Sequence, residues 1–74
     1  MTQKQVLEIV AQKGSYTADL TKKGDRISGI RNVSPAEELQ KKGILVLEKK
    51  ELLSINGNSE ITRFVWIPVG AIAP

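Results

Sequence analysis

The segment 34–47 most constrains what this chain can fold into, because the end signals of a helix are followed directly by an apolar run. Ser34 suits the N-cap, and Pro35 suits the first helical position, where its missing N–H would have no partner. Glu37 stands where the carboxylate of a capping box reaches back. At the other end, basic residues complement the helix dipole and a glycine suits a left-handed stop. These residues are Lys41, Lys42 and Gly43. The pattern predicts a helix over 34–42 that runs into a strand.

An earlier helix is expected from Thr2 to Lys13. Apolar residues recur there at helical spacing and form one stripe, while polar residues lie on the other side. Gly14 follows as the C-terminal stop. The stripe indicates a helix that packs against the core.

A second helix is expected over residues 18–28, followed by a turn over 29–33. Ser15 and Thr17 each suit its N-cap. Gly24 would cost about 1 kcal/mol inside that helix relative to alanine, which leaves a break there open. Helix, turn and capped helix then follow one another at the spacing of a helix-turn-helix.

From Ile44 onwards the pattern changes to that of strands. The Asn-Gly pair within 56–59 is the strongest hairpin signal in the chain. Phe64 and Trp66 are expected to pack under the helices, and Pro68 ends the last strand. The expected strands are 44–48, 51–55 and 61–67, rich in aliphatic and β-branched residues. The domain is therefore expected to span 1–68, with a flexible C-terminal tail over 69–74.

Composition argues against an enzyme. The 74 residues form one domain with a small core, and they include no cysteine and no histidine, the commonest general base and metal ligand. The glycines make no phosphate-binding loop, and Asp19, Asp25, Ser15 and Tyr16 form no pair at a catalytic spacing. We expect no catalytic residue, metal or small-molecule cofactor. With no apolar run long enough for a membrane span and no signal peptide, we expect a cytoplasmic protein that contacts no membrane.

The segment 29–44 resembles the small winged helix-turn-helix proteins of phages and bacteria. In those proteins a turn leads into a recognition helix, which closes on a basic-Gly-Ile junction before a β wing. The resemblance extends from about Thr2 to Ile67. It implies an α+β winged helix-turn-helix, with three helices followed by a two- or three-stranded antiparallel β-hairpin wing. It also implies a DNA-binding transcriptional regulator that places helix 34–42 in the major groove, with wing contacts to phosphates.

The net charge of +3, from 11 basic and 8 acidic residues, permits double-stranded DNA as the partner. Phosphate contacts are expected from basic residues around the turn, at the helix end and near the wing. These are Lys22, Lys23, Arg26, Arg31, Lys41, Lys42, Lys49, Lys50 and Arg63. Base contacts are expected at the exposed start of the third helix, from Arg31, Asn32, Ser34 and Glu38. Glu37 and Glu38 depart from the basic or amide residues such helices often present, although a carboxylate accepts from a cytosine amino group.

A protein-interaction module without nucleic acid is the alternative. Acidic residues lie among the lysines, and the apolar hairpin offers an edge that another chain can pair with. The acidic residues are Glu37, Glu38, Glu48, Glu51 and Glu60. A homodimer or a partner protein is also open under DNA binding, because one copy of so short a chain buries little DNA. If the basic residues share one face, DNA is favoured; if acidic residues interrupt that face, a protein partner is favoured.

Overall fold

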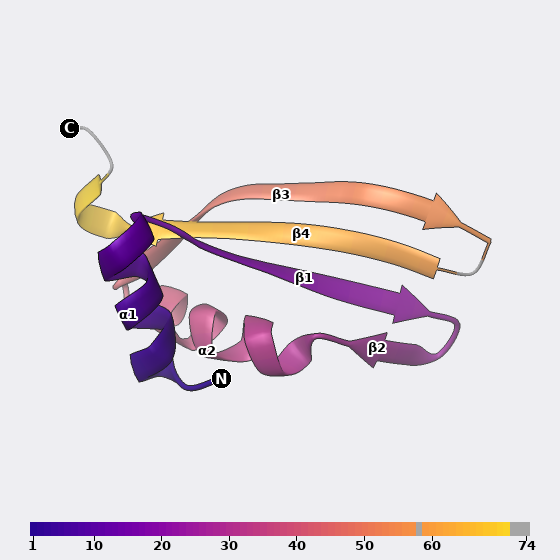
Figure 1. The fold of residues 1–74 in the computed structure, drawn as a ribbon, viewed down its shortest axis with the longest axis horizontal. Helices are drawn as coiled ribbons and strands as arrows, with labels where there is room; N and C mark the ends of the chain where they lie inside the picture. Colours follow the sequence, from indigo (N-terminus) through magenta and orange to yellow (C-terminus); the bar gives the residue numbers. More distant parts are fainter. Residues whose placement is uncertain (58, 72–74) are drawn as a thin grey trace.

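The computed structural model describes residues 1–57 and 59–71 of the chain. Within them, helices and strands follow in the order α1, β1, β2, α2, β3, β4 and a short 3-10 helix, η1 (Figure 1). The helices are α1 Gln3–Lys13, α2 Ile30–Lys41 and η1 Val69–Ala71. The strands are β1 Tyr16–Lys23, β2 Arg26–Ser28, β3 Leu45–Asn56 and β4 Ser59–Pro68.

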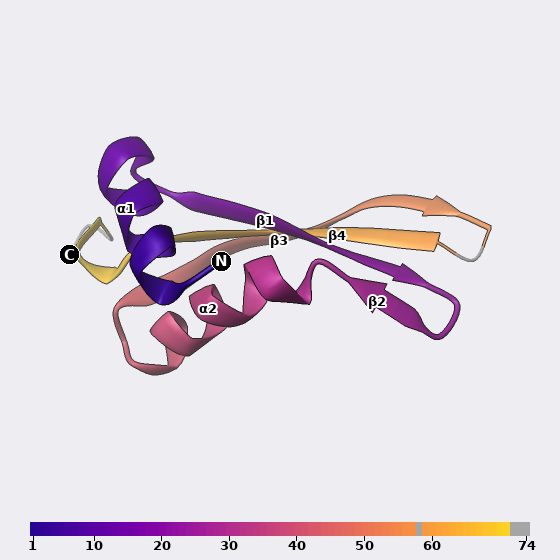
Figure 2. The same cartoon turned by 60° about the horizontal axis from the view of Figure 1, so that its bottom comes forward.

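The described strands form one antiparallel sheet in the order β2-β1-β4-β3. β4 pairs with β1 along its whole length, from Tyr16↔Trp66 to Lys23↔Ser59. β2 is short and pairs only with the last three residues of β1. Both hairpins extend past the start of α2, so one end of the sheet projects beyond the helices (Figure 1, and from a second side in Figure 2).

One apolar cluster joins both helices to the sheet. Alternation along β1 and β4 places Tyr16, Ala18, Phe64 and Trp66 on the same face, which the helices cover. Trp66 has no exposed surface, and its indole N–H donates to the side-chain oxygen of Gln40 at 2.9 Å. The buried members are Val6, Val10, Tyr16, Ala18, Val33, Ala36, Leu39, Leu45 and Trp66. The prediction that Trp66 packs under the helices is therefore confirmed.

The first helix and its Gly14 stop are confirmed, and the structure adds a capping box at its start. Thr2 is the N-cap, and its hydroxyl accepts from the Gln5 N–H at 3.1 Å. The Gln5 side chain in turn accepts from the Thr2 N–H, which completes a capping box. Gly14 follows at φ 82°, in the left-handed conformation that ends the helix.

The expected winged helix-turn-helix is wrong, because the segment predicted as the second helix forms strands instead. Residues 18–28 belong to β1 and β2, which a two-residue loop of Gly24 and Asp25 joins. Gly24 has φ +58°, whereas Asp25, like every other described non-glycine residue, has negative φ. This combination is that of a type II′ hairpin turn with glycine in its first position. The fold is α+β, but with two α-helices and a four-stranded antiparallel sheet over the described residues, and without the arrangement of three helices and a wing.

The helix predicted to start after a Ser34 cap begins earlier, at Ile30. Gly29 occupies the N-cap at φ 93° with no side-chain hydrogen bond, and Pro35 lies inside the helix, where its ring removes one intrahelical donor. The residues expected as a turn, 29–33, thus supply the first turn of α2. The local cap pattern was outweighed because Val33 and Ala36 both enter the core from a helix that starts at Ile30.

The two strands predicted at 44–48 and 51–55 are one strand, β3. Its pairing with β4 slips at two places, between Leu47 and Lys49 and between Leu52 and Ser54. The predicted turn at 56–59 joins β3 to β4, with Asn58 itself outside the described residues. The bulges bend one long strand where the sequence suggested a break.

The expected tail over 69–74 begins with η1. The Val69 N–H donates to the Ile44 carbonyl at 3.1 Å, which ties the end of β4 to the segment before β3. Residues 72–74 lie outside the described part of the chain.

Candidate functional site

Three basic residues lie together at the projecting end of the β1–β2 hairpin. Lys23 and Arg26 are cross-strand partners, and Lys22 pairs with Ile27. Partners share a sheet face, so Lys23 and Arg26 extend from one face of the hairpin and Lys22 from the other. All three are exposed. We call Lys22, Lys23 and Arg26 the basic ribbon.

Two carboxylates lie near the basic ribbon, but neither forms an ion pair with it in the described part of the chain. Asp25 is in the turn, and Glu60 is the partner of Lys22 on β4. The ion pairs among the described residues, Lys41–Glu38, Lys49–Glu51 and Arg63–Asp19, involve no residue of the ribbon. Its cations are therefore available for an external anion.

The predicted contacts on α2 are exposed but less basic. Arg31, Asn32 and Ser34 lie in its first turns. Glu38 and Lys41 form an ion pair at 3.8 Å one turn apart. After the helix, the Lys42 ammonium donates to the Gln3 side chain at 2.8 Å. This surface carries both signs of charge and is partly tied to its own neighbours.

The remaining predicted contacts lie on β3 and β4. Lys50 extends over the Phe64 ring, 5.7 Å from its centroid. On the opposite face, which we call the outer face, Lys49 pairs with Glu51 at 3.6 Å. Arg63 lies between Glu51 on β3 and Asp19 on β1 in the sheet register.

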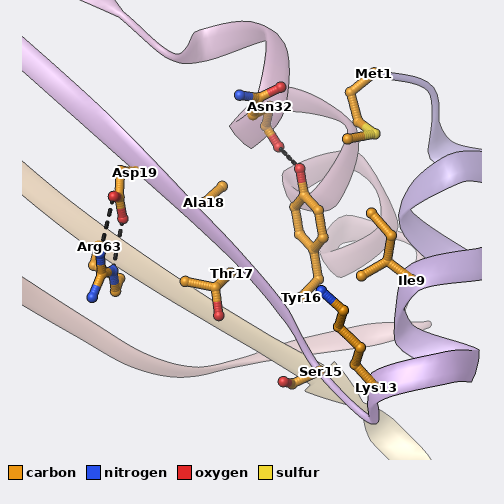
Figure 3. Close-up of a pocket in the computed structure, with 10 residues that line it drawn as sticks. All are labelled: Met1, Ile9, Lys13, Ser15, Tyr16, Thr17, Ala18, Asp19, Asn32 and Arg63. Atoms are coloured by element: carbon orange, nitrogen blue, oxygen red, sulfur yellow. Dashed lines mark hydrogen bonds and ion pairs between the residues drawn. The ribbon is translucent and has the colours of Figure 1, made fainter.

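Arg63 is held by a two-pronged ion pair. Its Nε donates to one Asp19 carboxylate oxygen at 2.9 Å and its Nη2 to the other at 3.2 Å (Figure 3). The hydrogen bond to Asp19 and the charges of Asp19 and Glu51 raise the pKa of the Arg63 guanidinium. Arg63 and Lys49 thus already have carboxylate partners, and the outer face is nearly neutral at its centre.

The predicted contact residues therefore fall into three separate groups, on the β1–β2 hairpin, on α2 and on β3–β4. The structure unites only Lys22, Lys23 and Arg26 without an ion pair among the described residues. Sequence reasoning placed these three on a helix. The Gly-Asp pair between runs of charged and β-branched residues is the signal that indicates a hairpin there.

A second feature, not foreseen from the sequence, is a cavity of about 480 Å³ beside the first half of β1. We call it the edge cavity. Its lining residues are Met1, Ile9, Lys13, Ser15, Tyr16, Thr17, Ala18, Asp19, Asn32 and Arg63. The buried Tyr16 ring forms one wall, and its hydroxyl donates to the Asn32 carbonyl at 2.8 Å (Figure 3). Burial raises the pKa of the Tyr16 phenol.

No metal site emerges from the described residues, which contain no cluster of three or more potential Asp, Glu, His or Cys ligands. Among the same residues, neither α-helix has the length and apolar character needed to cross a membrane.

Comparison of the chain with protein-family models, with curated proteins and with solved structures finds no match. A functional assignment therefore depends on the geometry of the chain itself.

Proposed function

We propose that this protein binds double-stranded DNA through the basic ribbon. The observation that supports the proposal most is the position of Lys22, Lys23 and Arg26: exposed, without internal ion pairs among the described residues, and on a two-stranded hairpin beyond the helices (Figure 1). Phosphate contacts from such cations supply most of non-specific DNA affinity. The proposal keeps the DNA partner expected from the sequence and moves the contact surface from α2 to the β1–β2 hairpin.

The β1–β2 hairpin forms one edge of the sheet, because β4 pairs with β1 as far as Lys23. We expect β2 and the turn, which form the free side of this edge, to approach the major groove of B-DNA, about 12 Å wide. In that position Arg26 and Lys23 extend from one face towards the same groove wall or base edges. Arg26 is the candidate for base recognition, because its guanidinium can donate twice to a guanine.

Charge removal in matched variants tests the proposal. The ribbon variant carries Lys22→Gln, Lys23→Gln and Arg26→Gln, and a helix variant carries Arg31→Gln, Lys41→Gln and Lys42→Gln. Both lose three positive charges, so net charge alone cannot distinguish them. Fluorescence anisotropy of a labelled duplex at several salt concentrations gives affinity and its salt dependence, and thermal melting confirms that each variant folds.

We expect log-linear weakening of wild-type binding with salt, with a slope reduced by about 2 to 3 in the ribbon variant, because each lost phosphate contact removes about 0.9. The helix variant should keep most of the slope. If both variants lose the same affinity and salt slope, net charge alone explains the binding. If the helix variant loses more, the DNA contact lies on α2. The absence of binding at low salt would reject DNA as the partner.

A further inference from the structure

The outer edge of the first half of β1 has no strand beside it among the described residues. β4 pairs with all of β1 on one side, from Tyr16 to Lys23. On the other side β2 pairs only with residues 21–23. Residues 16–20 therefore have no strand partner on that side among the described residues, and outward backbone groups that stay uncovered there can pair with another chain.

The hairpin register identifies which groups point outward. Lys23 and Arg26 close a two-residue loop, so they exchange both backbone hydrogen bonds. Counting back along β1, every second residue then directs its backbone N–H and C=O towards this same edge of the sheet. Those residues are Thr21, Asp19 and Thr17. At Asp19 the chain itself comes close, because a Cβ added to Gly29 would collide with the Asp19 carbonyl oxygen. Of the three residues, Thr17 remains, and its outward backbone N–H and C=O form no hydrogen bond within the described residues.

The edge cavity lies against this open edge and is largely preformed. Its volume of about 480 Å³ falls in the range of small-ligand and peptide-residue sites. Tyr16 is only 4% exposed and is anchored by its bond to Asn32, and Ala18 is also buried. Ile9 of α1 adds a partly buried apolar wall (Figure 3). An extended segment beside Thr17 would find an apolar wall for one side chain and a hydrogen-bonding edge for its backbone.

The other sheet edge, on β3, has features that discourage pairing with another chain. It has two register slips, and its centre carries the charged run Glu48 to Glu51. Bulges and edge charges are devices that block edge-to-edge association. Residues 16–20 of β1 contain no lysine or proline, and their pairing with β4 is regular. Beside Thr17, the edge of β1 therefore has fewer such devices than the edge of β3.

Charge at the cavity favours an acidic occupant. Arg63 is neutralised by its two bonds to Asp19. Lys13, at the end of α1, also lines the cavity and forms no ion pair with a described residue. A carboxylate beside Lys13 would supply the missing countercharge.

We propose that the edge cavity binds an extended peptide segment of a partner protein, which pairs with Thr17 as a short added strand and places a carboxylate beside Lys13. This mode of recognition draws affinity from main-chain hydrogen bonds and specificity from alternate side chains. The peptide site contains no residue of the basic ribbon, so its test is independent of the test of DNA binding.

Selection from a phage-displayed library of random linear heptapeptides tests this site. Wild-type protein and a Thr17→Pro variant are screened in parallel, since proline removes the outward N–H of the edge. The recovered peptides are synthesised and their affinities measured for wild type, Thr17→Pro, Thr17→Val as the matched control, and Lys13→Glu. Thermal melting checks the fold of each variant, and amide chemical shifts of the wild type locate the bound peptide without any variant.

We expect wild type to enrich peptides in which apolar residues alternate with an acidic one, and these peptides to shift amides in 13–19 and at Asn32. Thr17→Pro should weaken binding about tenfold, the effect of one backbone hydrogen bond, and Thr17→Val, which keeps the backbone N–H, should weaken it less than Thr17→Pro does. Lys13→Glu should weaken binding of acidic peptides. The inference is overturned if wild type enriches no peptide family that Thr17→Pro does not also enrich, or if the amide shifts map to other residues. If Thr17→Pro does not fold, the shift map alone decides.

Discussion

At the scale of single residues, Gly29 is the position where the fold depends most on the absence of a side chain. It has φ 93° at the start of α2, and a Cβ would strike the Asp19 carbonyl oxygen. Gly14 has a similar φ of 82°, but nothing lies within 4 Å of its missing Cβ. The two glycines separate the effect of backbone strain from that of a steric clash.

Gly14→Ala should therefore lower the free energy of unfolding by about 1–2 kcal/mol, the strain of a left-handed alanine. Gly29→Ala should lower it by about 3 kcal/mol or more, because α2 must also move away from β1. Urea denaturation of both variants measures the difference. Equal losses would mean that α2 and β1 do not approach as closely at this point as the structure has them.

Tyr16 gives the protein a pH-dependent contribution to stability. Burial raises the pKa of its phenol above the ordinary value of 10.0. The phenol has its ordinary pKa in the unfolded chain and a higher pKa in the folded chain. Between the two, the unfolded chain binds fewer protons at this site than the folded chain, so the free energy of unfolding falls as pH rises. The contribution is complete below pH 10 and is lost above it. Ionisation also removes the proton that Tyr16 donates to Asn32.

Below pH 10, Tyr16→Phe should be less stable than wild type by about 1 kcal/mol, the net value of one hydrogen bond. That difference should shrink as the pH is raised above 10, because only the wild type has the phenol to ionise. Denaturation of both proteins across this range measures it. A difference that stays constant with pH would contradict the assigned burial of the hydroxyl.

At the scale of elements, the predictions succeeded where the determining contacts are local. The helix at the N-terminus has its cap, its stripe and its stop within 14 residues, and it forms as expected. The segment 16–28 instead becomes strand because β4, some 40 residues away in the chain, pairs with all of β1. Its helical features were local, namely the two N-cap candidates Ser15 and Thr17. A long-range ladder outweighs such propensities, and periodicity alone does not reveal it.

A polar contact near the C-terminal end of α2 adds to the apolar packing between this helix and the sheet. Gln40 accepts from the indole N–H of Trp66 at 2.9 Å, and Trp66 is fully buried. Gln40→Ala leaves that N–H without its partner, and we expect a loss of about 1–3 kcal/mol in the free energy of unfolding. Gln12→Ala, at an exposed position of α1, should change it by less than about 0.5 kcal/mol. A loss at Gln40 no larger than that at Gln12 would show that water replaces the contact.

At the scale of the whole molecule, strands longer than helices explain why a basic end projects. α2 has 12 residues at about 1.5 Å each, whereas the 12 residues of β3 rise about 3.3 Å each, so the sheet extends well past its helical cover. The basic character of the chain and the residues of the ribbon could be identified from composition and local sequence. Their separation from Lys41, Lys49 and Arg63 could not, because it follows from strand order and from ion pairs between distant residues.

Titration of a short duplex into isotope-labelled protein, followed by amide chemical shifts, shows directly whether the β1–β2 hairpin or α2 contacts DNA. We expect the largest shifts in residues 21–28, and these shifts should diminish as salt is raised. Amides of 13–19 should stay largely unchanged, since the edge cavity belongs to a different surface. Shifts concentrated in residues 31–42 would instead place the DNA contact on α2.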